Sequence, residues 1–170
     1  YGFAFPLLAC GKKSIGESAL IAGCGGSARS VAYSLGTDFG VHRLTILGRD
    51  PERAEECKRH LERHLDRMVI DLVTLADLNT RLSRPYDIIV NCTPVGGWRQ
   101  LDETPFGNHS VFNSGGIYYD LNYNDQNRLV AQAKERGMIA LGGAPMLVAQ
   151  AVRSFEIWTD IQVKFDDIFR

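Results

Sequence analysis

Strand patterns and helix patterns alternate along almost the whole of this 170-residue sequence. Short apolar runs such as residues 86–91 (YDIIVN) are typical of buried strands, and longer segments with apolar residues three or four positions apart are typical of helices. Strands that alternate with helices over short connections pair in parallel, with helices covering both faces of the sheet. The sequence therefore predicts an α/β protein with a doubly wound, mainly parallel sheet, formed by residues 1–170 as a single domain.

The expected elements follow one another in a regular order. Strands are predicted at residues 18–23, 43–47, 68–73, 86–91, 116–121 and 138–141. Helices are predicted at residues 27–35, 51–66, 75–82, 127–136 and 145–160, and the tail to residue 170 is expected to add one more. Residues 96–113 are rich in glycine, proline, asparagine and aspartate, so we expect an irregular loop there.

Composition excludes several classes of partner. The formal net charge is -1, which gives no reason to expect a nucleic acid or an anionic membrane as a partner. No apolar run is long enough for a membrane span and no signal peptide is evident, so a cytoplasmic location is expected. The first residue is not methionine, which suggests a piece of a longer protein. The cysteines form no CxxC pair and no metal-ligand spacing with histidine, so free thiols and no metal are predicted for Cys10, Cys24, Cys57 and Cys92.

A glycine-rich segment stands where the first strand passes into the first helix. In residues 23–28 (GCGGSA), Gly23 permits a tight turn, Gly25 lets a ligand approach the backbone, and Gly26 widens the range of φ. Ala28 is small enough for the helix to pack on the strand, and the helix N-terminus carries a partial positive charge. The segment predicts a site for the pyrophosphate of a dinucleotide; the alternative is a glycine-rich turn with no ligand.

The residues after the second strand bear on which dinucleotide is bound. In Rossmann-like folds this position meets the adenosine ribose, where an acidic residue favours NAD and arginine favours the 2′-phosphate of NADP. Arg49 follows the strand directly, and Arg53 lies one helical turn later. Asp50 could accept hydrogen bonds from a free 2′-hydroxyl, repel a phosphate, or cap the helix that begins at Pro51. NADP is the expected cofactor, and NAD stays open.

Five motifs in order resemble those of the shikimate dehydrogenase family. They are residues 23–29, residues 48–50 with Arg53, residues 91–96 (NCTPVG), residues 120–123 (DLNY), and residues 143–150 with 155–159. The resemblance implies NADPH-dependent reduction of 3-dehydroshikimate to shikimate, a step of chorismate and aromatic amino-acid biosynthesis. The small-molecule substrate would be shikimate or 3-dehydroshikimate.

The resemblance also implies roles for individual residues. The pyrophosphate would be held by Gly23, Gly25, Gly26, Ser27 and Ala28, and the ribose 2′ position would face Arg49, Asp50 and Arg53. The nicotinamide side would be lined by Thr93, Leu121 and Gly143, with Asn91 and the turn after it in support. Tyr123 and Gln150 match positions that contact the hydroxylated substrate ring, and a phenol and a carboxamide can both hydrogen-bond hydroxyls. Spacing alone favours a strand-end surface position for Tyr123 and an ordinary polar position on the last helix for Gln150.

The chain holds no catalytic residue that the resemblance can assign. In the family a preceding domain holds most of the substrate and supplies a Lys and Asp pair. Gly2 and Phe3 resemble the Gly-Phe shortly after that Asp, so the chain would begin just past it. Lys12 and Lys13 are expected to be solvated. Hydride transfer needs groups on both sides of the substrate, so the chain alone is expected to bind cofactor without turnover.

Some positions depart from the family pattern and keep other functions open. Gly48 stands in place of the usual Asn, Asp50 in place of Thr, and Pro145 where Gly is common. One alternative is a shikimate dehydrogenase-like regulatory or sensor module that has lost catalysis. Another is an NAD-using quinate or shikimate dehydrogenase. A third is a dehydrogenase of the amino-acid or tetrahydrofolate type with a similar domain.

Overall fold

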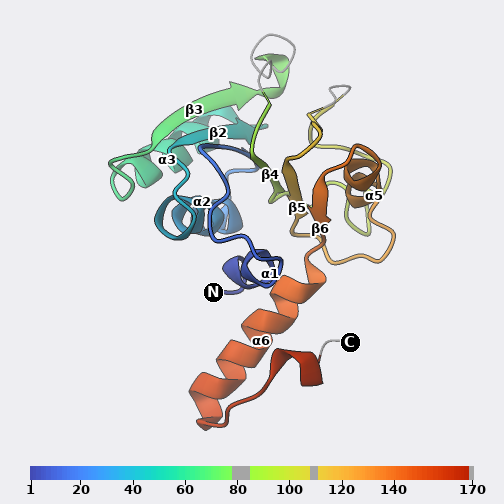
Figure 1. Cartoon of the computed structure of the whole chain (residues 1–170). Helices are drawn as coiled ribbons and strands as arrows, with labels where there is room; N and C mark the ends of the chain where they lie inside the picture. Colours follow the sequence, from blue (N-terminus) through green and yellow to red (C-terminus); the bar gives the residue numbers. More distant parts are fainter. Residues whose placement is uncertain (78–84, 108–110, 169–170) are drawn as a thin grey trace.

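One parallel sheet organises the molecule. The computed structural model describes residues 1–77, 85–107 and 111–168. Within these residues six strands pair in the order β3-β2-β1-β4-β5-β6, and every neighbouring pair is parallel (Figure 1). The strands are β1 Ser18–Ala22, β2 Arg43–Gly48, β3 Val69–Thr74, β4 Ile88–Asn91, β5 Ile117–Asp120 and β6 Ile139–Leu141. Because the strand order reverses between β1 and β4, the predicted Rossmann-like, doubly wound sheet is confirmed.

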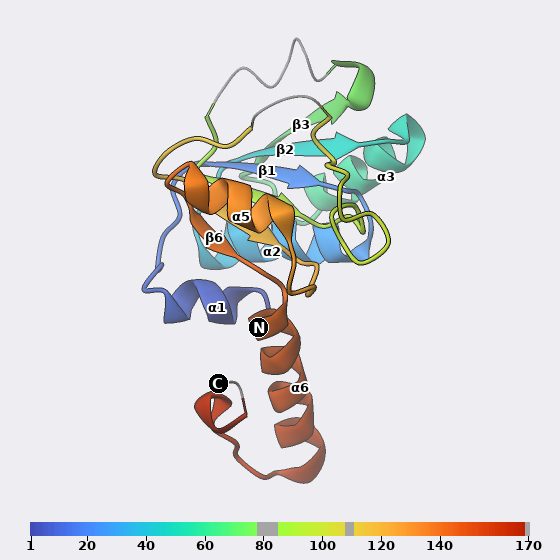
Figure 2. The same cartoon turned by 90° about the vertical axis from the view of Figure 1, so that its right-hand side faces the viewer.

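Helices cover both faces of this sheet. They are α1 Ala4–Ala9, α2 Gly26–Asp38, α3 Pro51–Glu62, α5 Arg128–Glu135 and α6 Ala144–Thr159, with 3₁₀ turns η1 Leu75–Asp77 and η2 Phe165–Asp167. One apolar cluster joins α1, α2 and α3 to one face of the sheet. A second cluster joins α5 and Phe106 to the opposite face (Figure 2). Both faces are therefore buried, as continuous apolar strands require.

The helix predicted for residues 51–66 ends at Glu62, four residues early. Beyond Arg63 the chain turns inward, so that Leu65 and Met68 are 7% exposed. Both side chains pack where Gly36 of α2 leaves room, since a Cβ added at Gly36 would lie 2.8 Å from Met68 Cε. Burial of these two side chains stabilises the turn more than another helical turn on the surface would.

Other predicted boundaries also change. The helix predicted for residues 75–82 is a 3₁₀ turn over residues 75–77, and residues 78–82 lie outside the described residues. Up to residue 168, where the described residues end, the tail forms η2 and no longer helix. No element was predicted before residue 18, yet α1 is helical and buries Leu7 completely. A segment this short has too few positions for its apolar spacing to distinguish helix from loop.

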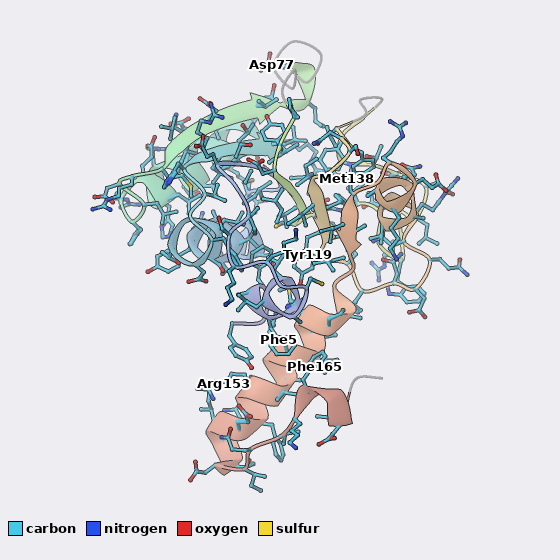
Figure 3. The ribbon with its side chains drawn as sticks, viewed as in Figure 1. Phe5, Asp77, Tyr119, Met138, Arg153 and Phe165 are labelled. Carbon is cyan, nitrogen blue, oxygen red and sulfur yellow. The ribbon has the colours of Figure 1, made fainter. Side chains whose placement is uncertain are left out.

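The second half of α6 projects from the body of the molecule (Figures 1 and 2). Near its base it packs against α1, and η2 folds back on it. Figure 3 shows Phe5 beside Phe165, with ring centroids 4.5 Å apart, and Arg153 further along the helix. Large apolar side chains on this projecting part, Phe155, Ile157 and Trp158, are exposed, as is Ile161 just beyond the end of α6. Trp158 is 84% exposed, so the described residues leave this surface of α6 uncovered.

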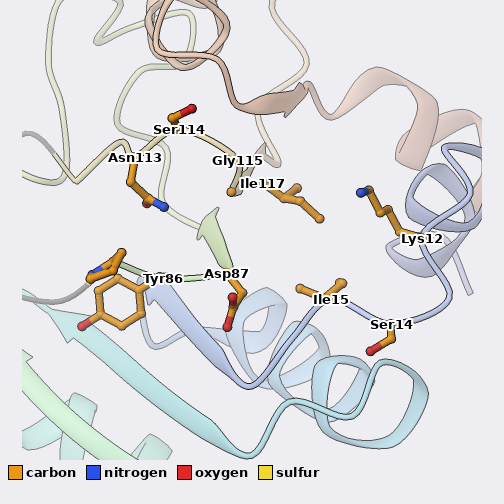
Figure 4. Close-up of a pocket in the computed structure, with 11 residues that line it drawn as sticks. Lys12, Ser14, Ile15, Tyr86, Asp87, Asn113, Ser114, Gly115 and Ile117 are labelled. Atoms are coloured by element: carbon orange, nitrogen blue, oxygen red, sulfur yellow. The ribbon is translucent and has the colours of Figure 1, made fainter.

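A polar cavity of about 290 Å³ lies where β4 and β5 begin, at the amino edge of the sheet (Figure 4). Lys12 and Asp87 are among its lining residues. The Asp87 carboxylate accepts hydrogen bonds from the backbone N–H of Glu17 (3.0 Å) and from the N–H and hydroxyl of Ser18 (2.9 and 2.8 Å). Burial alone raises the pKa of Asp87, but the hydrogen bonds from Ser18 and Glu17 lower it on balance. Asp87 therefore joins the starts of β1 and β4.

Candidate functional site

The turn after β1 has the geometry of an anion cradle. Gly23 has φ of +109°, and a Cβ there would lie 3.3 Å from the Cys92 carbonyl oxygen, so the position requires glycine. A Cβ at Gly25 or Gly26 would meet nothing within 4 Å. Helix α2 begins at Gly26 with no side-chain cap, so its first N–H groups are open to an incoming anion. The loop is therefore closely packed at Gly23 and has open space beside Gly25 and Gly26.

The structure contradicts the reason predicted for Gly26 and agrees with the reason predicted for Ala28. Gly26 was expected to need a wide range of φ, and this is wrong, because it is the first residue of α2 and its φ is not positive. What glycine provides there is open space. Ala28 is 2% exposed and packs in the core cluster with Ile21, as a small residue between helix and strand should. Ser27 is exposed beside the open part of the loop.

The end of β2 presents two arginines beside the glycine turn. Strands β1 and β2 are neighbours, with Ala22 paired to Leu47, so their ends meet at the carboxyl edge. Arg49 and Arg53 are exposed, and neither forms an ion pair with any residue that the structure describes. Two guanidinium groups without a counter-charge at this position can bind a phosphate dianion.

Asp50 caps helix α3. Its Oδ1 accepts hydrogen bonds from the backbone N–H groups of Glu52 (3.0 Å) and Arg53 (3.3 Å). The N-cap role, one of the three readings of this residue, is confirmed. Because the cap sets the direction of the first turn of α3, Asp50 also determines where Arg53 stands.

Asn91, at the end of β4, holds the turn that follows it. The side chain is fully buried. Its Oδ1 accepts hydrogen bonds from the backbone N–H (3.0 Å) and hydroxyl (2.7 Å) of Thr93. Its Nδ2 donates to the Val95 carbonyl oxygen (2.8 Å) and to Asp120 Oδ2 (3.1 Å). The turn over residues 93–96 is thus fixed to β4 by one amide.

A buried carboxylate lies beside this amide. Asp120 is fully buried, and its Oδ2 also accepts a hydrogen bond from the Tyr118 hydroxyl (2.7 Å). Its Oδ1 accepts from the backbone N–H (2.9 Å) and side-chain amide (2.8 Å) of Asn122. Burial, and then the charge of Asp120, raise the pKa of Tyr118 far above its ordinary value, so the phenol stays a donor. Tyr118 and Asn122 were not predicted as site residues; the signal available was polar residues within and after an otherwise apolar strand.

The start of α6 approaches the end of β5 very closely. Gly143 is buried, and a Cβ there would lie 2.2 Å from the Leu121 carbonyl oxygen and 2.9 Å from that of Asn122. The Gly143 N–H donates to the Asn122 carbonyl oxygen (2.9 Å). Only glycine fits this contact. Thr93, Leu121 and Gly143, the three predicted nicotinamide-side residues, therefore stand on segments joined by hydrogen bonds.

The two predicted substrate residues are not gathered into one cavity. Gln150 lies on α6 with its side chain against Gly2, where a Cβ would lie 2.3 Å from Gln150 Cγ. It lines a cavity of about 480 Å³ between residues 1–3, α2 and α6, together with Ser27. Tyr123 is 56% exposed beyond the end of β5 and does not line this cavity. Their joint role in substrate binding stays a prediction.

Metal and thiol chemistry find little support in the part of the chain that the structure describes. No group of three or more metal-ligating side chains occurs within residues 1–77, 85–107 and 111–168. The four cysteines are free thiols. Burial raises the pKa of Cys57 and of Cys92, which keeps both protonated. None of the described helices is both long and apolar enough to span a membrane.

A parallel sheet with this order, an open glycine turn after β1 and free arginines after β2 define a dinucleotide-binding α/β fold. Residues 143–168 match the model of the Shikimate 5'-dehydrogenase C-terminal domain. The shikimate dehydrogenase (NADP(+)) of Salinibacter ruber is 35% identical over 164 residues, which are 94% of this chain and 56% of that protein. The chain is thus similar to members of the shikimate dehydrogenase family over nearly its whole length.

Solved structures agree with this similarity. The shikimate 5-dehydrogenase of Listeria monocytogenes, in complex with shikimate and NAD, superposes with a TM-score of 0.84 at 26% identity, covering 98% of this chain and 59% of that one. A chorismate mutase/shikimate 5-dehydrogenase fusion protein from Clostridium acetobutylicum superposes with a TM-score of 0.78 at 29% identity, covering 99% and 58%. The chain thus spans little more than half the length of the relatives it matches.

Proposed function

We propose that this chain is the NADP(H)-binding half of a shikimate dehydrogenase, which reduces 3-dehydroshikimate to shikimate. The observation that carries the proposal is the pair of unpaired arginines, Arg49 and Arg53, beside an open glycine turn. A relative that is 35% identical is named for NADP(+). The bound nicotinamide would supply the hydride, while residues of this chain hold the pyrophosphate, the ribose phosphate and the nicotinamide in place.

The other half of the active site belongs, in this proposal, to a second domain. Two observations support it: the chain spans 56% of the Salinibacter ruber enzyme, and the projecting part of α6 exposes Phe155, Ile157 and Trp158. An apolar helix surface of this kind is suited to cover by another domain. Lys12 lines the cavity at the amino edge, away from the glycine turn, so it is not assigned a catalytic role. The location in the cytoplasm stays a prediction.

Calorimetric titration of the purified chain should give a clear preference for NADP⁺ over NAD⁺. Arg49→Ala is expected to weaken NADP⁺ binding by roughly tenfold to a hundredfold, because one charged hydrogen bond to the phosphate is lost, and to leave NAD⁺ binding almost unchanged. Arg59→Ala is the matched control, since Arg59 is an exposed arginine near the end of α3. Equal losses for both nucleotides would contradict the phosphate role. If the chain binds neither nucleotide, the result would favour the alternative of a regulatory or sensor module that has lost catalysis.

The purified chain is expected to show no dehydrogenase turnover with NADPH and 3-dehydroshikimate. The reason is geometric, because the substrate must be held against the nicotinamide from both sides and only one side is present. Loss of NADPH absorbance with time measures the reaction, and a whole relative such as the Salinibacter ruber enzyme serves as the positive control. Steady turnover by the chain alone would refute the assignment of the catalytic groups to a second domain.

A further inference from the structure

We propose that Asn122 is a positioning residue that sets the nicotinamide end of the cofactor site by joining three segments of backbone. The inference rests on the proposed function. It assigns a role to a residue that neither its spacing nor the family resemblance singled out. Asn122 is the second residue after β5, between Leu121 and Tyr123, at the carboxyl edge of the sheet.

The contacts of Asn122 reach three parts of the chain. Its Nδ2 donates to the carbonyl oxygens of Thr93 (3.0 Å) and Val95 (3.3 Å), in the turn after β4. The same nitrogen lies 2.8 Å from Asp120 Oδ1, at the end of β5, so its two hydrogens are shared among three acceptor oxygens. Its own carbonyl oxygen accepts from the Gly143 N–H (2.9 Å), at the start of α6. One residue therefore fixes the turn, the strand end and the helix start relative to one another.

The buried carboxylate of Asp120 gives this arrangement its rigidity. Tyr118 and Asn91 donate to one carboxylate oxygen, and the backbone and side chain of Asn122 donate to the other. No ion pair involves Asp120 among the residues that the structure describes, so these neutral donors compensate its burial. Rotating the Asn122 amide would remove a donor from the buried carboxylate, so its orientation is fixed.

Packing also restricts the residue type at position 122. A Cβ added at Gly97 would lie 2.7 Å from Asn122 Oδ1, so Gly97 leaves just enough room for the amide. An aspartate at position 122 would turn a negative charge toward Asp120 and two carbonyl oxygens. An apolar residue would leave the Thr93 and Val95 carbonyl oxygens without this donor. Asparagine supplies the donor at this length.

The position of these contacts connects them to the nicotinamide. A dinucleotide crosses the carboxyl edge of such a sheet at the point where the strand order reverses, here between β1 and β4. With the adenosine half next to β2, the nicotinamide half lies over the ends of β4 and β5. Asn122 bonds to Thr93 and to Gly143 and is covalently joined to Leu121. These are the three residues expected to line that half.

Two ligands separate a positioning role from a general structural one. NADP⁺ occupies both halves of the site, whereas adenosine 2′,5′-bisphosphate carries only the adenosine half with its 2′-phosphate. In calorimetric titrations of the chain, Asn122→Ala is expected to weaken NADP⁺ binding about tenfold, the effect of losing the hydrogen bonds that fix the turn. Binding of adenosine 2′,5′-bisphosphate is expected to stay within about twofold of wild type, because its contacts lie at β1 and β2.

Two further variants complete the experiment. Tyr118→Phe removes one donor to Asp120 and should give a smaller loss with the same selectivity for NADP⁺, which keeps the test available if Asn122→Ala folds poorly. Asn113→Ala changes an asparagine at the amino-edge cavity and should change neither affinity. Unchanged NADP⁺ affinity, or equal losses for the two ligands, would overturn the positioning role. If the wild-type chain binds neither ligand, the proposed function itself fails, and the inference fails with it.

Discussion

Replacing Gly143 with alanine is expected to lower the free energy of unfolding by about 3 kcal/mol, at the upper end of the cost of overpacking. The added methyl carbon would lie 2.2 Å from the Leu121 carbonyl oxygen and 2.6 Å from its carbonyl carbon. Both are backbone atoms, so no side chain can rotate away. Relief requires the end of β5 and the start of α6 to separate, which also breaks the hydrogen bond from the Gly143 N–H to Asn122.

The adjacent glycine provides a matched control for this result. A Cβ added at Gly142 would meet nothing within 4 Å, and its φ is not positive. Gly142→Ala should therefore change stability by no more than about 0.5 kcal/mol. Urea unfolding followed by circular dichroism measures both variants against wild type. Similar midpoints for Gly143→Ala and wild type would show that the contact between β5 and α6 is far looser than the structure has it.

Much of the fold could be predicted because its signals are local. Buried strands such as β4 are continuous apolar runs, and the helices between them have regular spacing, which together specify a parallel sheet. The end of α3 could not be predicted in this way. Leu65 and Met68 pack at Gly36 instead of extending α3. No local sequence pattern indicates this contact, because it is made with a helix earlier in the chain.

The site likewise has a part that local motifs predict and a part that depends on contacts between distant segments. The glycine turn and the cap at Asp50 are made by neighbouring residues, so sequence motifs reveal them. The network around Asp120 depends on register, because β4 and β5 pair with Asn91 opposite Asp120. A parallel register between strands about thirty residues apart is set by packing of the sheet, and the close approach at Gly143 is equally non-local.

Gly48 shows how the structure explains a departure from the family pattern. The resemblance has asparagine at this position, and glycine here is one of the departures that keep other functions open. A Cβ at Gly48 would lie 2.6 Å from the Cβ of Ala54, so α3 packs more closely on β2 than any larger residue allows. The same helix carries Arg53 in its first turn. Glycine at position 48 therefore helps to position the arginines, as Asp50 does by capping α3.

Replacing Gly25 with alanine is expected to abolish most cofactor binding while leaving the fold intact. The backbone of Gly25 is extended, with φ of -84° and ψ of -168°, which alanine adopts freely. The new methyl group would meet no protein atom within 4 Å, so the free energy of unfolding should change by no more than about 0.5 kcal/mol. The space it enters is the space that the pyrophosphate needs, and we expect affinity to fall about a hundredfold.

The pattern across nucleotides distinguishes this loss from that of the arginine variant. NADP⁺ and NAD⁺ share the pyrophosphate, so Gly25→Ala should weaken both by the same factor, whereas Arg49→Ala should weaken NADP⁺ alone. Parallel calorimetric titrations, with urea unfolding of each variant, measure both quantities. A Gly25→Ala chain that is stable and still binds both nucleotides would remove the pyrophosphate from this loop. Equal losses of affinity for the two nucleotides, with unchanged stability, would place the pyrophosphate against the start of α2, which has no side-chain cap.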